Sequence, residues 1–273
     1  MQLKKKLPKT VRGTQQQINI EPNKTNTLKT NADLDKPYLR EYEGKRALHF
    51  AAQSSQSEMS IDMPDALVLG YTRAMMSFLL LEPSPKRIAM IGLGGGSLAK
   101  YCYRHLPSTE ITVVEINPDV IALRNEFAIP ANDARFNVLL GDGAAYVKDT
   151  DGQLDALMVD GFDVGGIPVQ LSSQSFYDDC FASLANNGIL VVNLWGSNER
   201  YPEYLERIQK SFSDCVTVVD SDDSFNKIVI AVKTEQFPTT SNVIRHHANL
   251  LSLSHPLNFH AKSNKLIDAL QMG

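Results

Sequence analysis

From Lys86 onward, short apolar segments alternate with helix-like segments in a pattern that few folds accommodate. The apolar segments occupy residues 87–92, 110–116, 136–143, 154–163 and 188–196. Near-continuous apolar strands of this kind are typical of a parallel sheet that is covered on both faces. Because segments of helical periodicity lie between them, we expect an α/β fold built on a Rossmann-like, doubly wound, mostly parallel sheet.

Other segments flank this core. Residues 1–36 are polar and lysine-rich, which favours a flexible basic tail because little apolar surface offsets chain entropy. Residues 37–66 alternate loosely around a Gly–Lys pair, which indicates a small β-hairpin region. The remaining residues, 67–273, are predicted to form one Rossmann-like domain.

Three features are expected within that domain. A buried helix should cover residues 64–82, since Pro64 begins the segment and Pro83 follows it. A helix over 174–185 should end at an Asn–Asn–Gly turn before the fifth strand. A hairpin over 215–232 should close the sheet, ahead of mostly helical C-terminal residues.

Net charge, the length of apolar runs and the cysteines indicate which partners and compartments to expect. A net charge of −4 gives no reason to expect nucleic acid. The apolar runs are far shorter than a membrane helix needs, and no apolar segment typical of a secretory signal follows the basic N-terminus. Cys102, Cys180 and Cys215 form no CxxC pair and are expected to be reduced. These features predict a soluble, cytoplasmic protein.

A glycine-rich turn follows the first strand of the sheet, from Gly92 through Gly94 and Gly95 to Gly96. Glycines let the backbone approach a ligand closely, and the next helix offers free N–H groups. Glu115 ends the second strand about twenty residues later, where a carboxylate can accept hydrogen bonds from ribose hydroxyls. The combination predicts a nucleotide site at the carboxyl ends of the strands.

The residues at the end of the third strand indicate which kind of nucleotide the site binds. Asp142 and Gly143 lie there, and a carboxylate at that edge can accept a hydrogen bond from the adenine amine. Asp–Gly is also a common turn pair, so a structural role for Asp142 is the alternative. Glycine spacing favours an S-adenosylmethionine-type site, with a dinucleotide as the other ligand open at this point.

Two carboxylates follow the fourth strand in one short loop, at Asp160 and Asp163. Like charges so close together repel, which makes a purely structural use costly. They could bind a cationic amine, and one could take up its proton as a general base. The alternative is that one caps the next turn while the other is solvated. No His or Cys spacing indicates a metal site.

From about Pro37 to Lys233 the chain resembles the polyamine aminopropyltransferases, or spermidine synthases, on the class I S-adenosylmethionine methyltransferase fold. The D-x-x-D loop with the downstream residues "SFY" is the most specific match, and Gln56 and Tyr71 lie near the positions of the family's active-site glutamine and tyrosine. The matching segments are "IGLGGGSLAK", "VVEINPDVI", "LLGDGAAYV", "LDALMVDGFDVGG", "SQSFYDDC" and "NGILVVNLWG".

The resemblance implies decarboxylated S-adenosylmethionine as co-substrate, with no tightly bound cofactor. An amine would attack the propyl carbon next to the sulfonium, and 5′-methylthioadenosine would leave. Asp160 would accept the amine proton, and Asp163 would orient the acceptor. Glu115 would bind ribose and Asp142 adenine. The family also implies a small amine partner and a homodimer.

The chain departs from the family at the residues that distinguish substrates. Gly95 replaces an aspartate that contacts the aminopropyl group of the donor. Arg73 replaces a glutamate, and Trp195 stands where an acidic residue is expected in the substrate site. A loop "DSDDSFNK" replaces the family's "TYPSG". Fewer carboxylates should weaken diamine binding, unless aspartates of this loop substitute for them.

Three functions are therefore compatible with the sequence. The first is an aminopropyltransferase-like enzyme whose acceptor differs from putrescine. The second is an S-adenosylmethionine methyltransferase, because Gly95 removes a negative charge that would repel the methionine carboxylate of the intact donor. The third is a non-catalytic adenosyl-binding protein that kept the fold.

Overall fold

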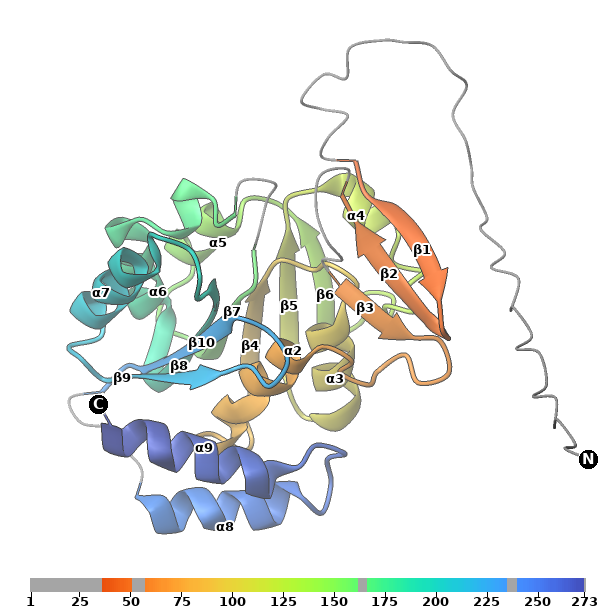
Figure 1. Ribbon diagram of the computed structural model, residues 1–273. Helices are drawn as coiled ribbons and strands as arrows, with labels where there is room; N and C mark the ends of the chain where they lie inside the picture. The colour runs from red at the N-terminus through yellow and green to blue at the C-terminus, as the bar shows by residue number, and fades with distance from the viewer. Residues whose placement is uncertain (1–35, 51–56, 162–165, 235–239, 273) are drawn as a thin grey trace, which may run out of the picture.

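The computed structural model describes residues 36–50, 57–161, 166–234 and 240–272. A seven-stranded sheet forms its centre (Figure 1). Its strands are β4 (Arg87–Ile91), β5 (Glu110–Glu115), β6 (Phe136–Leu140), β7 (Leu154–Val159), β8 (Leu184–Trp195), β9 (Val216–Asp220) and β10 (Asn226–Val232).

The strand order is β6-β5-β4-β7-β8-β10-β9. The strands from β6 to β8 pair in parallel, whereas β10 pairs antiparallel with both β8 and β9. The predicted mostly parallel sheet with a closing hairpin is confirmed. Chain order reverses beside β4, since β5 and β7 flank it, and this reversal opens a crevice at the carboxyl ends of the strands.

Helices cover both faces of the sheet, as the doubly wound prediction requires (Figure 1). The buried apolar residues form two cores. One core packs the sheet against a first group of helices, and the other core packs it against a second group. The first group is α2 (Gly70–Met75), the 3₁₀ helix η1 (Met76–Leu80), α3 (Ser97–His105), α4 (Pro118–Ala122), α8 (Ser241–Leu251) and α9 (Phe259–Met272). The second is α5 (Gly143–Lys148), the 3₁₀ helix η2 (Val169–Leu171), α6 (Gln174–Ser183) and α7 (Tyr201–Ser211).

A small antiparallel sheet precedes the large one and confirms the predicted N-terminal β region. It consists of β1 (Tyr38–Tyr42), β2 (Lys45–His49) and β3 (Ser57–Ser60). Glu43 and Gly44 both have positive φ, of 49° and 73°, as a two-residue turn between twisted strands requires. The third strand was not expected from the sequence. The limits of the predicted domains remain a prediction, and residues 1–35 of the predicted tail lie outside the described residues.

Two predicted element boundaries are wrong. The helix expected from residue 64 begins only at Gly70, where the Asp223 carboxylate accepts the first free N–H group. The fifth strand begins at Leu184, because Asn187 and Gly188 form an irregularity within β8 and do not end a helix before it. A Cβ on Gly188 would lie 2.7 Å from the Leu154 carbonyl oxygen of β7, so only glycine permits this pairing. Helix α7 was not predicted.

Within the described ranges, none of the helices combines the length and apolar character that crossing a bilayer requires.

Candidate active site

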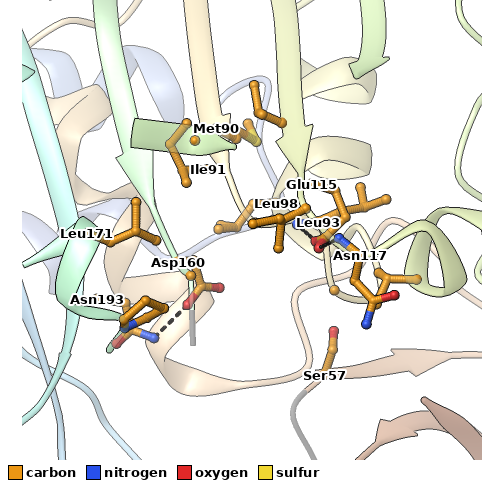
Figure 2. A pocket seen from close by; sticks show the side chains of 18 of the residues that line it. Ser57, Met90, Ile91, Leu93, Leu98, Glu115, Asn117, Asp160, Leu171 and Asn193 are labelled. Atoms are coloured by element: carbon orange, nitrogen blue, oxygen red, sulfur yellow. Dashed lines mark hydrogen bonds between the residues drawn. The ribbon is translucent and has the colours of Figure 1, made fainter. Parts of the chain in front are cut away.

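A cavity of about 820 Å³ lies over the crevice at the carboxyl ends of the strands. Residues that follow β4, β5, β6 and β7 line it, together with residues from the ends of β8 and β10 and from α2 (Figure 2). Most of the predicted site residues meet here: Tyr71, Gly92, Gly94, Glu115, Asp142, Gly143, Asp160 and Trp195. Gln56 and Asp163 lie outside the described residues.

The glycine turn owes its shape to the neighbouring strand. Gly92 has φ +95°, and a Cβ there would lie 2.4 Å from the backbone oxygen of Asp160. Gly94, with φ +50°, also adopts a conformation that favours glycine. The close approach brings the turn after β4 against the end of β7. The turn and Asp160 therefore face the same cavity.

Gly95 and Gly96 belong to the turn but do not line the cavity. A Cβ on Gly95 would lie 2.8 Å from Ser57 Oγ and 2.9 Å from a ring carbon of Phe127. Phe127 is fully buried, so it has little freedom to move away. The position where the family has an aspartate is thus closed to a side chain by Ser57 and Phe127 of this chain.

Glu115 is buried and serves both the turn and the cavity. Its Oε2 accepts a hydrogen bond from the Leu93 N–H at 2.8 Å, and its Oε1 accepts one from the Asn117 N–H at 2.8 Å (Figure 2). Each carboxylate oxygen has two lone pairs, so each can accept one further bond from a ligand hydroxyl. Glu115 therefore orders the glycine turn while facing the cavity.

Asp142 has the structural role that its sequence context allowed, and it also lines the cavity. Its Oδ1 caps α5 by accepting from the Ala144 and Ala145 N–H groups at 2.7 and 3.3 Å. The cap leaves Oδ2 to a ligand. The next position, 143, requires glycine, because a Cβ there would lie 2.3 Å from the Ile91 side chain of β4.

Asp160 lies at the end of β7, between the glycine turn and β8. Asn193 Nδ2 donates a hydrogen bond to Asp160 Oδ1 at 2.8 Å (Figure 2). Burial raises the pKa of the Asp160 carboxyl group, whereas hydrogen bonding from Asn193 and Tyr71 lowers it. Burial and the nearby Asp160 charge raise the pKa of Tyr71 well above its ordinary value, so its hydroxyl stays a donor. A carboxylate with a raised pKa is a better proton acceptor near neutrality.

A chain of polar side chains beside Asp160, all of which line the cavity, was missed from the sequence. Asn226 Nδ2 donates to Asn193 Oδ1 at 2.8 Å, and Ser224 Oγ donates to Asn226 Oδ1 at 2.6 Å. Asn193 and Asn226 are both buried. Asn193 could have been noticed, because it is a polar residue inside the apolar run "ILVVNLW". Asn226 carries no such signal, since it begins a strand after a polar loop.

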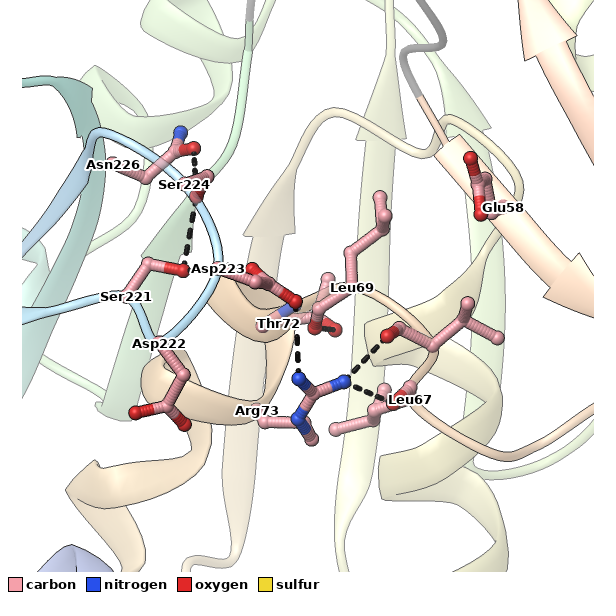
Figure 3. Close-up of polar contacts among 12 residues, drawn as sticks. Glu58, Leu67, Leu69, Thr72, Arg73, Ser221, Asp222, Asp223, Ser224 and Asn226 are labelled. Carbon is pink, nitrogen blue, oxygen red and sulfur yellow. Dashed lines mark hydrogen bonds and ion pairs between the residues drawn. The ribbon is translucent and has the colours of Figure 1, made fainter.

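The loop aspartates do not replace missing carboxylates in the cavity. Asp220 pairs with Lys227 at 2.6 Å, Asp222 pairs with Lys265 of α9, and Asp223 pairs with Arg73 at 3.1 Å (Figure 3). None of the three lines the cavity. The charge reversal at Arg73 is thus matched by an aspartate from the replaced loop.

The lining of the cavity is acidic. Glu115, Asp142 and Asp160 line it, and among the described residues no Lys, Arg or His does. Uncompensated carboxylates favour a cationic ligand. Within the described ranges, no cluster of His, Cys, Asp or Glu has the arrangement of a metal site.

Comparison with known protein families agrees with this geometry. Residues 69–233 match the model of the spermine/spermidine synthase domain. The chain belongs to the spermine/spermidine synthase family. The matched range contains the described cavity residues from the glycine turn to Asn226.

Curated members of this family are similar over most of their length. A polyamine aminopropyltransferase from Chromobacterium violaceum is 38% identical over 222 residues, which cover 81% of this chain and 85% of that protein. One from Neisseria meningitidis serogroup B is 37% identical over 217 residues, covering 79% and 82%.

Solved structures of a spermidine synthase and of a methyltransferase-like protein share the fold. A probable spermidine synthase from Corynebacterium glutamicum superposes with a TM-score of 0.65 at 19% identity, covering 81% of this chain and 85% of that one. Human methyltransferase-like protein 13, in complex with SAH, gives a TM-score of 0.61 at 20% identity, with 68% and 91% covered. These likenesses confirm the class I methyltransferase-like fold that the sequence predicted.

Proposed function

We propose that this protein transfers an aminopropyl group from decarboxylated S-adenosylmethionine to a small amine. The observation that carries the proposal is the acidic cavity, which extends from Glu115 and Asp142 past Asp160 to Asn193. The donor carries a positive sulfonium and the acceptor becomes positive as it reacts, so both suit a lining that has carboxylates and no described cation. Family membership and the relatives named polyamine aminopropyltransferase support the same assignment.

The donor occupies the half of the cavity over β4, β5 and β6. The Glu115 carboxylate accepts hydrogen bonds from the ribose hydroxyls, and Asp142 Oδ2 accepts one from the adenine amine. The glycine turn leaves room for the ribose close to the backbone, because Gly92 and Gly94 carry no side chain. This placement directs the sulfonium toward Asp160 at the end of β7.

Transfer is a direct displacement at the propyl carbon. The acceptor nitrogen forms the new C–N bond while the C–S bond breaks, and the sulfur keeps the bonding pair as the thioether of 5′-methylthioadenosine. Asp160 takes the proton that the nitrogen loses. Holding the amine in line with the reacting carbon supplies most of the acceleration, because two substrates then react as one. No cofactor takes part.

The acceptor occupies the half over β7, β8 and β10. Tyr71 donates its hydroxyl hydrogen, Trp195 offers an aromatic face, and Asp163 orients the attacking nitrogen. The acceptor can differ from putrescine, since Trp195 replaces an acidic residue and the loop aspartates pair with basic side chains outside the cavity. We also propose a cytoplasmic location and a homodimer, which size-exclusion chromatography with light scattering can test.

Methylation is the second candidate, and Gly95 is the observation that favours it. With no carboxylate at this position, nothing there repels the carboxylate of intact S-adenosylmethionine. The two reactions use different donors, so identifying the donor that this protein uses distinguishes them.

The experiment offers both donors at equal concentration, with a mixture of small amines, and separates the nucleoside products by mass spectrometry. We expect 5′-methylthioadenosine together with an amine that is heavier by one aminopropyl group. S-Adenosylhomocysteine as the main product would replace aminopropyl transfer by methylation. Binding of either donor without any product would show a protein that binds adenosyl ligands and does no chemistry.

A further inference from the structure

We propose that the loop between β9 and β10, residues 221–225, positions the Asp160 carboxylate through a closed ring of contacts. The ring leaves Asp160 through β8 and β10, crosses the loop to Asp223, and returns through α2. The inference rests on the proposed function, which gives Asp160 its role in catalysis. It assigns Asp223, Ser224, Asn226 and Asn193 as positioning residues.

The first arm of the ring contains only neutral groups. Asp160 accepts from Asn193, and Asn193 accepts from Asn226, both at 2.8 Å. The single proton of the Ser224 hydroxyl is shared between Asn226 Oδ1 at 2.6 Å and Ser221 Oγ at 2.9 Å. Donors point toward Asp160 at each amide, so an ionised carboxylate polarises the arm and is held by it.

The second arm begins at Asp223 in the same loop. Ser221 Oγ donates to Asp223 Oδ1 at 3.2 Å. The two oxygens of Asp223 accept the Gly70 N–H at 3.0 and 2.9 Å, and Arg73 donates to Oδ2 at 3.1 Å (Figure 3). A Cβ on Gly70 would lie 2.1 Å from Asp223 Oδ1, so glycine is needed for this approach.

Helix α2 completes the ring at the next residue. Tyr71 follows Gly70, lines the cavity and hydrogen-bonds to Asp160. The carboxylate of Asp223 therefore sets the start of α2, and the start of α2 sets Tyr71. Asp160 is held from two sides by one loop, although no atom of Asp223 lines the cavity.

The neighbouring aspartate supplies a matched control. Asp222 and Asp223 are 50% and 48% exposed at the side chain, and each pairs with one basic residue. Asp222 pairs with Lys265 of α9, away from the ring. The substitutions Asp222→Asn and Asp223→Asn remove the same charge from the same loop. Only the second weakens the ring, because the amide keeps one acceptor oxygen for the Gly70 N–H and loses the charge that pairs with Arg73.

Steady-state kinetics of the two variants test the ring. We expect Asp223→Asn to lower kcat by about tenfold or more, since a small displacement of a catalytic group costs up to ~100-fold. KM for the donor should stay within about twofold, because Glu115 and Asp142 are untouched. Asp222→Asn should leave kcat and KM within about twofold. Equal behaviour of the two variants would overturn the proposal.

A titration that needs no turnover separates this inference from the proposed function. The described groups that face the Asp160 carboxylate are Tyr71 from α2 and Asn193 from β8, and both lower its pKa. Cutting the ring should raise that pKa, measured by ¹³C carboxyl NMR, in Asp223→Asn relative to Asp222→Asn. If the pKa of Asp160 shifts in Asp223→Asn but the wild type forms no product, the proposed transferase activity is refuted and the ring of contacts is supported. Products without a shift or a difference in kcat would refute the ring alone.

Ser224→Ala provides the same test if Asp223→Asn does not fold. It removes one hydroxyl of the first arm without changing charge. Because Ser224 also lines the cavity, the pKa of Asp160 is measured beside kcat: we expect kcat to fall several-fold and that pKa to rise, with thermal stability close to wild type. An unchanged kcat in this variant would overturn the proposal.

Discussion

The two halves of the cavity are built in different ways. On the proposed donor side, each carboxylate is held by backbone N–H groups: Asp142 by Ala144 and Ala145, and Glu115 by Asn117 and, 22 residues before it, by Leu93 of the glycine turn. On the proposed acceptor side, Asp160 is held by a side chain, that of Asn193, 33 residues away, and Asn193 by Asn226, another 33 residues on. Backbone contacts, most of them local, thus build the donor half, and side-chain contacts between distant strands build the acceptor half.

This difference predicts where substitutions act. A change in the donor half should loosen one ligand group and leave the rest of the cavity intact. A change in the acceptor half should disturb a network, because each side chain there orients the next. Kinetic constants for donor and acceptor should therefore respond separately.

Asp160→Asn should have the largest effect, since it removes the proton acceptor at the junction of the two halves. We expect kcat to fall by about 10²–10⁴-fold while the KM of the donor changes little. In the wild type, activity should be lost as the pH falls through the raised pKa of Asp160, because the protonated carboxyl group cannot take a proton. The acid limb of the pH profile should therefore lie above the usual range for aspartate.

A stability measurement on the same variant checks the cause. A carboxyl group whose pKa is higher in the folded than in the unfolded protein costs stability once it is ionised, so Asp160→Asn should raise the melting temperature at neutral pH. Asp155 at the opposite end of β7 is the control, as it accepts the Lys86 and Arg87 N–H groups outside the cavity. Asp155→Asn should lower stability and leave kcat unchanged. Loss of turnover in both variants would refute the role of Asp160.

Glu115→Gln should have the next largest effect, confined to the donor. The amide has one acceptor oxygen where the carboxylate has two, so it loses either the Leu93 or the Asn117 N–H bond as well as a charged ribose contact. Hydrogen bonds to charged groups contribute about 1.5–3 kcal/mol, so donor affinity should fall by about 10- to 100-fold. Calorimetry of donor binding measures this, and the KM of the acceptor should stay constant. An equal rise in both constants would contradict separate halves.

Restoring the family residue by Gly95→Asp should damage the fold without improving donor recognition. The new Cβ meets Ser57 and Phe127 at under 3 Å, and overpacking of this kind costs about 1–3 kcal/mol. Denaturant unfolding of Gly95→Ala against Gly141→Ala isolates the cause, because a Cβ on Gly141 has a single neighbour at 3.7 Å. A stable Gly95→Asp protein with a lower KM for the decarboxylated donor would show that the position opens to the ligand.

The difference between the donor half and the acceptor half also explains which features could be predicted from the sequence. The sheet, the crevice and the donor carboxylates depend on strand periodicity and on residues that follow strand ends, which are visible in one segment at a time. The place of Glu115 and Asp142 at the cavity was therefore predicted correctly, and their contacts with a donor remain a proposal. The Asn–Asn–Gly of β8 was misinterpreted as a helix end, because the strand irregularity that contains it depends on pairing with β7, a distant segment.

The contacts that orient Asp160 in the acceptor half could not be predicted, for the same reason. Asn193 contacts Asp160 only because β8 pairs with β7, and Asn226 contacts Asn193 only because β10 returns beside β8. Nothing in the segment "DSDDSFNK" reveals that its third acidic residue would cap α2. The sequence suggested these aspartates as substitutes for missing carboxylates, and the structure pairs all three with cations outside the cavity.

Trp195→Ala should have the smallest effect and confine it to the acceptor. Trp195 lines the cavity at the end of β8 with its side chain 44% exposed, so an amine bound against its ring keeps part of its hydration. An exposed cation–π contact contributes about 0.5–1 kcal/mol, which predicts a two- to fivefold rise in acceptor KM. Phe225→Ala is the control, since Phe225 packs edge-on against Trp195 without lining the cavity. Equal changes in both variants would assign the effect to packing of the aromatic pair. A change in donor KM would show that Trp195 contacts the donor and not the acceptor.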